Sequence, residues 1–93
     1  MKNKYDKVVK LIIKLDSNDN VQLKSDDIEV SEINNYIVIK FYANEKYAEI
    51  DIDKECPQYS TVSVSPGKAI NKDDCLLFAE IIDNAETIID MAA

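Results

Sequence analysis

The chain contains no histidine, no tryptophan and no arginine, so all 11 of its cationic side chains are lysines. Without histidine there is no imidazole to act as a catalytic base or metal ligand, and a serine or cysteine nucleophile lacks its usual partner. Without arginine there is no guanidinium fork for bidentate phosphate binding. These absences predict a protein with no catalytic residues, no metal and no cofactor, and one that does not bind nucleic acid directly.

Glycine, proline and cysteine are also scarce. One glycine and two prolines leave no room for a flexible linker, and 93 residues, 46% of them hydrophobic, predict a single domain over 1–93. The apolar runs are too short to span a membrane, and lysines interrupt the apolar start of the chain, so no signal peptide is expected. The two cysteines predict reduced thiols and a cytoplasmic protein, with one Cys56–Cys75 disulfide as the alternative.

The N-terminal segment 8–15, VVKLIIKL, is apolar at every second position and rich in β-branched residues. This alternation predicts a strand that returns, through a turn at 16–20, to a second arm at 21–23. A helix is the alternative, because apolar residues from Tyr5 to Ile13 also recur at i, i+3 and i+4 spacing.

Three further strands are predicted at 27–33, 36–42 and 47–53, joined by turns at Asn34-Asn35 and 43–46. Folding at these turns gives one register, in which the apolar residues meet on one face. The predicted pairs are Val30 with Ile39, Ile28 with Phe41, Phe41 with Ala48, and Ile39 with Ile50, while Glu29, Lys40 and Glu49 form a row on the other face.

The segment from residue 65 onward is predicted to begin with a turn at 66–67 and to continue as a helix whose N-cap is Asn71. The Gly-Lys pair at 67–68 is not a phosphate-binding loop, because the upstream glycine and the following Ser or Thr of that motif are missing. The apolar stripe of the helix, over about 72–91, comprises Cys75, Leu77, Phe78, Ile81, Ile82, Ala85, Ile88, Ile89 and Ala92.

Together these elements predict an α+β fold. The sheet is an antiparallel β-meander of five to six strands over about 7–65, and its last strand, 59–65, turns Val62 and Val64 inward. One C-terminal amphipathic helix packs on one face of this sheet, with Cys75 in the core.

Charge is unevenly distributed along the chain. Residues 1–24 carry six lysines and three aspartates, net +3, whereas residues 25–93 carry five lysines and fifteen acids, net −10, and the two sum to −7. Such a field repels nucleic acid and attracts basic protein surfaces. The outer face of the predicted helix is the most one-sided part, with Asp73, Glu80, Asp83, Glu86 and Asp90.

This stripe of one sign has two interpretations. It is a solvated surface that keeps the protein soluble, or a docking surface for a basic partner. Acids one helical turn apart lie ~5–6 Å from each other, which is comparable to the phosphate spacing along a nucleic-acid strand. The stripe could therefore occupy a nucleic-acid site on another protein.

The outer face of the sheet is a second candidate surface, because alternation places acidic residues and tyrosines there together. Tyrosine is enriched at protein interfaces, being rigid and amphipathic. Ordinary strand composition is the alternative, since tyrosine has a high β-propensity. The candidate residues are Glu49, Asp51, Asp53, Tyr36, Tyr42 and Tyr47.

In size, acidity, sheet-plus-helix pattern and lack of a catalytic set, the chain resembles small phage-encoded inhibitors of host defence, including anti-CRISPR and anti-restriction proteins. It is also similar to immunity proteins that neutralise basic nuclease toxins. The resemblance implies a non-enzymatic, stoichiometric inhibitor that mimics DNA and blocks the basic nucleic-acid-binding site of an effector such as a CRISPR or restriction nuclease. A structural module that self-associates through a sheet edge, as a homodimer, is the alternative.

Overall fold

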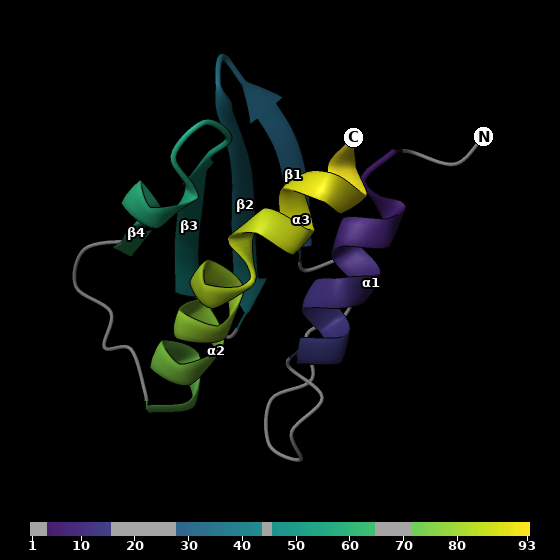
Figure 1. The fold of residues 1–93 in the computed structure, drawn as a ribbon. Coiled ribbons are helices and arrows are strands. Elements are labelled where there is room, and N and C mark those ends of the chain that lie inside the picture. The colour runs from purple at the N-terminus through teal and green to yellow at the C-terminus, as the bar shows by residue number, and fades with distance from the viewer. Residues whose placement is uncertain (1–3, 16–27, 44–45, 65–71) are drawn as a thin grey trace.

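The computed structural model describes residues 4–15, 28–43, 46–64 and 72–93, and these form one layer of helices over one face of an antiparallel sheet (Figure 1). The strand order is β1-β2-β3-β4. The strands are β1 (Ile28–Ile33), β2 (Tyr36–Ala43), β3 (Lys46–Asp53) and β4 (Thr61–Val64), with a 3-10 turn, η2 (Pro57–Tyr59), before β4. The helices are α1 (Asp6–Leu15), α2 (Lys72–Asp83) and α3 (Ala85–Ala92).

The segment 8–15, predicted as a strand, is instead part of α1. Val8 and Ile12, one helical turn apart, are completely buried, while Lys10 and Lys14 are exposed. This burial follows the helical period and not the two-residue period of a strand. The β-branched residues were misleading, because β-propensity is weak compared with the gain from burying an apolar helical face against the rest of the fold.

The α+β class and the antiparallel meander are confirmed, and the predicted strand number is matched only in part. Residues 6–15 are helical, so the first predicted strand is absent, and the described residues form a sheet of four strands, the first of them β1. The predicted return arm at 21–23, the turn at 66–67 and the N-cap at Asn71 lie outside the described residues.

The predicted register of the first three strands of the sheet is confirmed. All four predicted apolar pairs are present, and Lys40 lies opposite both Glu29 and Glu49. The β1–β2 turn places Asn34 at φ 56°, a left-handed conformation that asparagine adopts far more readily than a β-branched residue does. A short turn of this kind leaves the two strands only one register in which to pair.

β4 is shorter and more exposed than predicted. Its pairing places Val62 opposite Ile50 and Val64 opposite Ala48, so both valines lie on the helix-covered side of the sheet. Val62 is nevertheless 36% exposed, because β4 is the last strand at one edge. Tyr59, predicted in this strand, lies in η2 and is exposed.

The predicted single C-terminal helix is interrupted. Asn84 leaves helical geometry at φ −102° and ψ 18°, and its Nδ2 donates a 2.8 Å hydrogen bond to the Glu80 carbonyl oxygen. An asparagine amide that competes for backbone groups in this way is typical of helix ends. The chain therefore changes direction between α2 and α3 (Figure 1).

The core lies between the helices and the covered face of the sheet. α1 packs against β1, α2 and α3, so segments far apart in the sequence lie side by side (Figure 1). Cys75, predicted in the core, is exposed, because it lies at the margin of the apolar stripe in the first half of α2; both cysteines are free thiols. The completely buried large side chains are Val8, Ile12, Ile37, Ile39, Ile50, Ile52, Ile81 and Ile88.

Candidate functional site

The residues predicted to form binding surfaces fall on opposite sides of the sheet. One set belongs to the helical layer, and the other lies on the open face, which none of the described helices covers (Figure 1). The side chain of Asp73 lies outside the described part of the chain. We call the first set, Glu80, Asp83, Glu86 and Asp90, the helical acidic surface, and the second set, Tyr42, Tyr47, Glu49 and Asp51, the open-face cluster.

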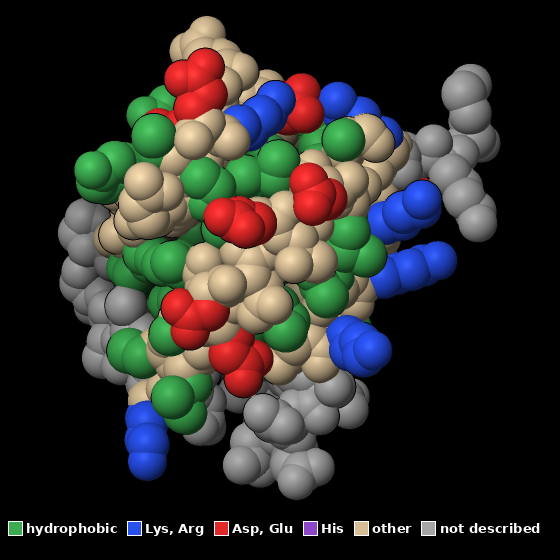
Figure 2. Space-filling model, viewed as in Figure 1, with side chains coloured by type: hydrophobic (Ala, Val, Ile, Leu, Met, Phe, Trp, Pro, Cys, Tyr) green, Lys and Arg blue, Asp and Glu red, His purple; other side chains and the backbone are tan. Residues whose placement is uncertain are grey.

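The helical acidic surface is not neutralised by the described residues around it. Asp83, Glu86 and Asp90 are exposed and Glu80 is half-buried. None of the four carboxylates forms an ion pair with a described residue, since the ion pairs in that part of the chain involve Glu32. Figure 2 shows acidic side chains spread over the helices, with neutral and hydrophobic atoms between them; lysines lie mainly at the α1 side, with others at the top of the view and near the start of α2. The bend at Asn84 divides this surface between two helices instead of one straight stripe.

The open-face cluster contains a cross-strand pair of tyrosines. Tyr42 of β2 lies opposite Tyr47 of β3, with ring centroids 5.1 Å apart, a separation typical of favourable aromatic pairs. Tyr47 Oη donates a 2.8 Å hydrogen bond to Glu49 Oε1 on the same strand. This hydrogen bond to a carboxylate raises the pKa of Tyr47 to about 12, so the phenol stays protonated at neutral pH.

Asp51 is the member of this cluster whose carboxylate is buried without a hydrogen-bond donor among the described residues. It lies opposite Val38, which is only 4% exposed although it belongs to the open face. Asp51 Oδ1 is buried and has no hydrogen-bond donor within the described residues. Burial, followed by the neighbouring Glu49 carboxylate, raises the pKa of Asp51, and Lys40 only partly opposes this change. This environment favours the protonated form of Asp51.

Asp53, another predicted partner-binding residue, has a structural role. Its Oδ1 accepts hydrogen bonds from Asn35 Nδ2 at 2.9 Å, from the Glu55 backbone N–H at 2.9 Å and from the Cys56 backbone N–H at 3.2 Å. These bonds connect the β1–β2 turn to the loop after β3. Tyr36, directly opposite Asp53, is 42% exposed and remains accessible to a partner.

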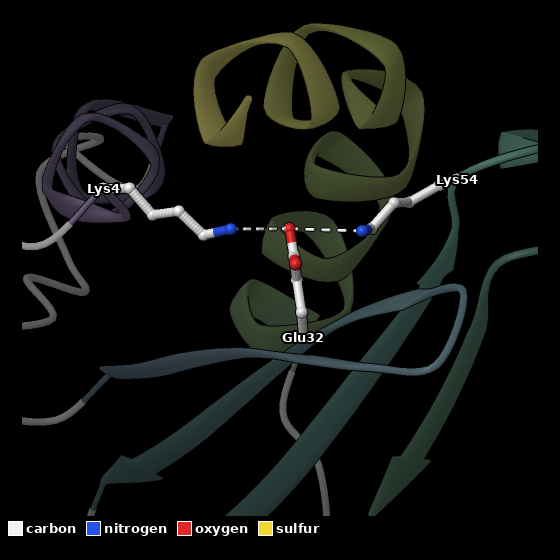
Figure 3. Close-up of polar contacts among 3 residues, drawn as sticks. All are labelled: Lys4, Glu32 and Lys54. Atoms are coloured by element: carbon white, nitrogen blue, oxygen red, sulfur yellow. Dashed lines mark ion pairs between the residues drawn. The ribbon is translucent and has the colours of Figure 1, made fainter.

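Glu32 was not singled out from the sequence, yet it has the most extensive ionic contacts of the described acids. Its Oε1 is 3.2 Å from Lys54 Nζ and 3.2 Å from Lys4 Nζ, so one oxygen joins the end of β3 to the start of α1 (Figure 3). The hydrogen bonds from Lys54 and then Lys4 lower the pKa of Glu32. Glu32 occupies a covered-face position otherwise filled by apolar residues, and that break in the alternation was the available signal.

The described residues contain no group of three metal-binding side chains that could hold an ion. No helix in the described segments combines the length and the apolar character needed to cross a bilayer. Comparisons of the chain with protein-family models, with curated proteins and with solved structures gave no match.

Proposed function

We propose that the protein is a non-enzymatic binding protein whose helical acidic surface docks onto a basic surface of another protein. The supporting observation is a difference among its carboxylates. Glu32 is held by two lysines and Asp53 by three hydrogen-bond donors, whereas the acids of α2 and α3 have no counter-ion among the described residues. Apart from Glu86, which lies in the first turn of α3 where the helix dipole favours an acid, these like charges on the helices repel one another.

The partner that fits this surface is a protein that binds nucleic acid. Such proteins present lysine and arginine side chains that neutralise phosphates, and carboxylates on a rigid helical layer offer the same sign of charge to those side chains. Occupation of that site excludes the nucleic acid, so the chain acts as a stoichiometric inhibitor of an effector such as a CRISPR or restriction nuclease. Association is expected to be fast and to weaken with salt.

Two charge-matched double variants test this proposal. Asp83→Lys/Glu86→Lys changes the helical acidic surface, and Glu29→Lys/Glu55→Lys makes the same change in net charge at exposed acids elsewhere. A lysine-rich peptide serves as a surrogate for the basic surface. Its affinity for each variant is measured by calorimetry at physiological salt, where the Debye length is about 8 Å. The helical variant should weaken binding by about ten-fold or more, and the control by much less.

A second measurement uses the proposed target class directly. DNA cleavage by a CRISPR or restriction nuclease should fall as the protein is added, reach its minimum near one protein per nuclease, and recover with the helical double variant. Equal loss of peptide binding in both double variants would show that net charge alone attracts cations and that α2 and α3 form no specific docking surface.

A further inference from the structure

The two edges of the sheet are protected differently. β1 carries Glu29 and Glu32, and α1 lies beside it (Figure 1). β4, at the other edge, has the sequence TVSV without a charged residue. A strand edge presents unpaired N–H and C=O groups that can pair with another chain, and proteins commonly guard such edges with charged side chains. Among the described residues, only the β1 edge has that protection.

The uncharged character extends well beyond β4. No aspartate, glutamate or lysine occurs between Glu55 and Lys68, in a chain of which 31% is charged. This is the longest uncharged stretch of the sequence. Two copies of a protein with net charge −7 repel each other over most of their surfaces. The side chains of β4 contribute no charge to that repulsion.

The side chains of β4 are also available for contact. Thr61, Val62 and Ser63 are all exposed, and the exposed fraction of Val62 is 36% although it lies on the helix-covered side. A strand added beside β4 would cover Val62 and would pair with the outer backbone groups of β4, which no described strand occupies. Tyr59, 69% exposed in the preceding η2 turn, extends the uncharged surface.

We propose that two copies of this chain associate through their β4 strands, antiparallel and about a twofold axis perpendicular to the sheet, to give one continuous eight-stranded sheet. Opposite residues of antiparallel strands face the same side. Under this symmetry a valine of one copy therefore faces a valine of the other on the helix side, and Thr61 or Ser63 faces Thr61 or Ser63 on the open side. The surface is thus self-complementary, as a twofold interface requires.

This symmetry has a consequence for the helices. A twofold axis perpendicular to the sheet keeps both helical layers on the same side, so the dimer carries two helical acidic surfaces facing in one direction. If the proposed function holds, on which this consequence rests, the dimer binds extended basic surfaces bivalently. The dimer itself does not depend on that function.

Sedimentation equilibrium over a wide range of protein concentration tests the dimer. Ser63→Glu places like charges in the centre of the proposed interface, whereas Thr87→Glu adds the same charge at an exposed position of α3. The native chain and Thr87→Glu should dimerise alike, and Ser63→Glu should dimerise at least ten-fold more weakly. Circular dichroism of both variants checks that neither substitution unfolds the chain.

Salt separates this proposal from the proposed function. High salt should preserve or strengthen the dimer, because it screens the repulsion between two acidic copies, and it should weaken docking to a basic partner. Amide hydrogen exchange in β4 should slow as protein concentration rises. A native chain that stays monomeric at its highest soluble concentration, or a Ser63→Glu variant that dimerises normally, overturns the proposal and leaves the helical acidic surface untouched.

Discussion

The two faces of the sheet bury residues in different ways. On the covered face, Ile39 is completely buried beneath the helical layer. The helices of this layer precede the strands in the sequence (α1) or follow them (α2 and α3). On the open face, Val38, its neighbour on β2, is 4% exposed without any described helix over it, and its cross-strand neighbours are Ser31 and Asp51. Burial on the covered face thus depends on the whole fold, and burial on the open face depends on its strand neighbours.

Truncation of these two neighbours gives the largest expected contrast. Ile39→Ala should lower the free energy of unfolding by about 2–5 kcal/mol, because the surrounding helices and strands cannot collapse into the cavity. Val38→Ala should cost roughly 1–2 kcal/mol, since it removes fewer carbons and the polar neighbours can rearrange or admit water. Urea denaturation of both variants measures the difference; equal losses would mean that the open face is as rigidly packed as the core.

A substitution at Asp51 tests the same comparison through charge. Asp51→Asn removes a carboxylate whose buried Oδ1 has no donor among the described residues and allows the new amide to donate to Glu49. We expect the variant to be more stable than the native chain at neutral pH by up to about 1 kcal/mol. Thermal unfolding between pH 3 and pH 8 is the measurement.

The pH dependence of this gain has a definite sign. Folding raises the pKa of Asp51 above its ordinary 3.8, so the stability associated with its protonated form is present below that value and is lost as pH rises through the folded-state pKa. The advantage of Asp51→Asn should therefore be greatest at neutral pH and vanish in acid. An advantage that persists unchanged in acid would rule out the carboxylate as its source.

Glu32, on the covered face, should behave in the opposite way and with the smallest effect. Its folded-state pKa is lowered below 4.5, so its stabilising contribution is present above that value and is lost as pH falls through the folded-state pKa. Glu32→Gln should lower the melting temperature by about 1–3 °C at neutral pH, because the ion pairs are partly exposed.

Salt and acid supply the controls for Glu32. High salt should reduce the cost of Glu32→Gln, because screening weakens the ion pairs with Lys4 and Lys54. In acid the native chain and Glu32→Gln should have the same melting temperature. A cost that is independent of both pH and salt would assign Glu32 a packing role and not an ionic one.

The sheet was predictable because its determinants are local. Alternating residues in β1, β2 and β3, with a short turn at Asn34-Asn35, leave one register that places most of the apolar residues, but not Val38, on the covered face. α1 was not predictable in the same way, because its sequence satisfies the strand and helix periods together. Only its packing against the other helices and β1, which a single sequence does not display, decides between them.

The candidate surfaces also divide into features that follow from local periodicity and features that depend on tertiary packing. The charges of α2 and α3 and the shared face of Tyr42, Tyr47, Glu49 and Asp51 follow from periodicity alone. The contacts that distinguish one carboxylate from another do not, because Glu32 meets Lys4 and Lys54 only after α1 and β3 are in place. Which acids remain free for a partner therefore becomes visible only in three dimensions.

The packing of α1 against α3 has a consequence for biosynthesis. Val8 and Ile12 of α1 leave the ribosome before the strands do, but α3, which packs against α1, is translated after every other described element. The apolar face of α1 therefore stays exposed in the nascent chain while the hairpins form. Folding can be completed only after α3 has emerged. Slow translation of the C-terminal segment should accordingly prolong the need for chaperones.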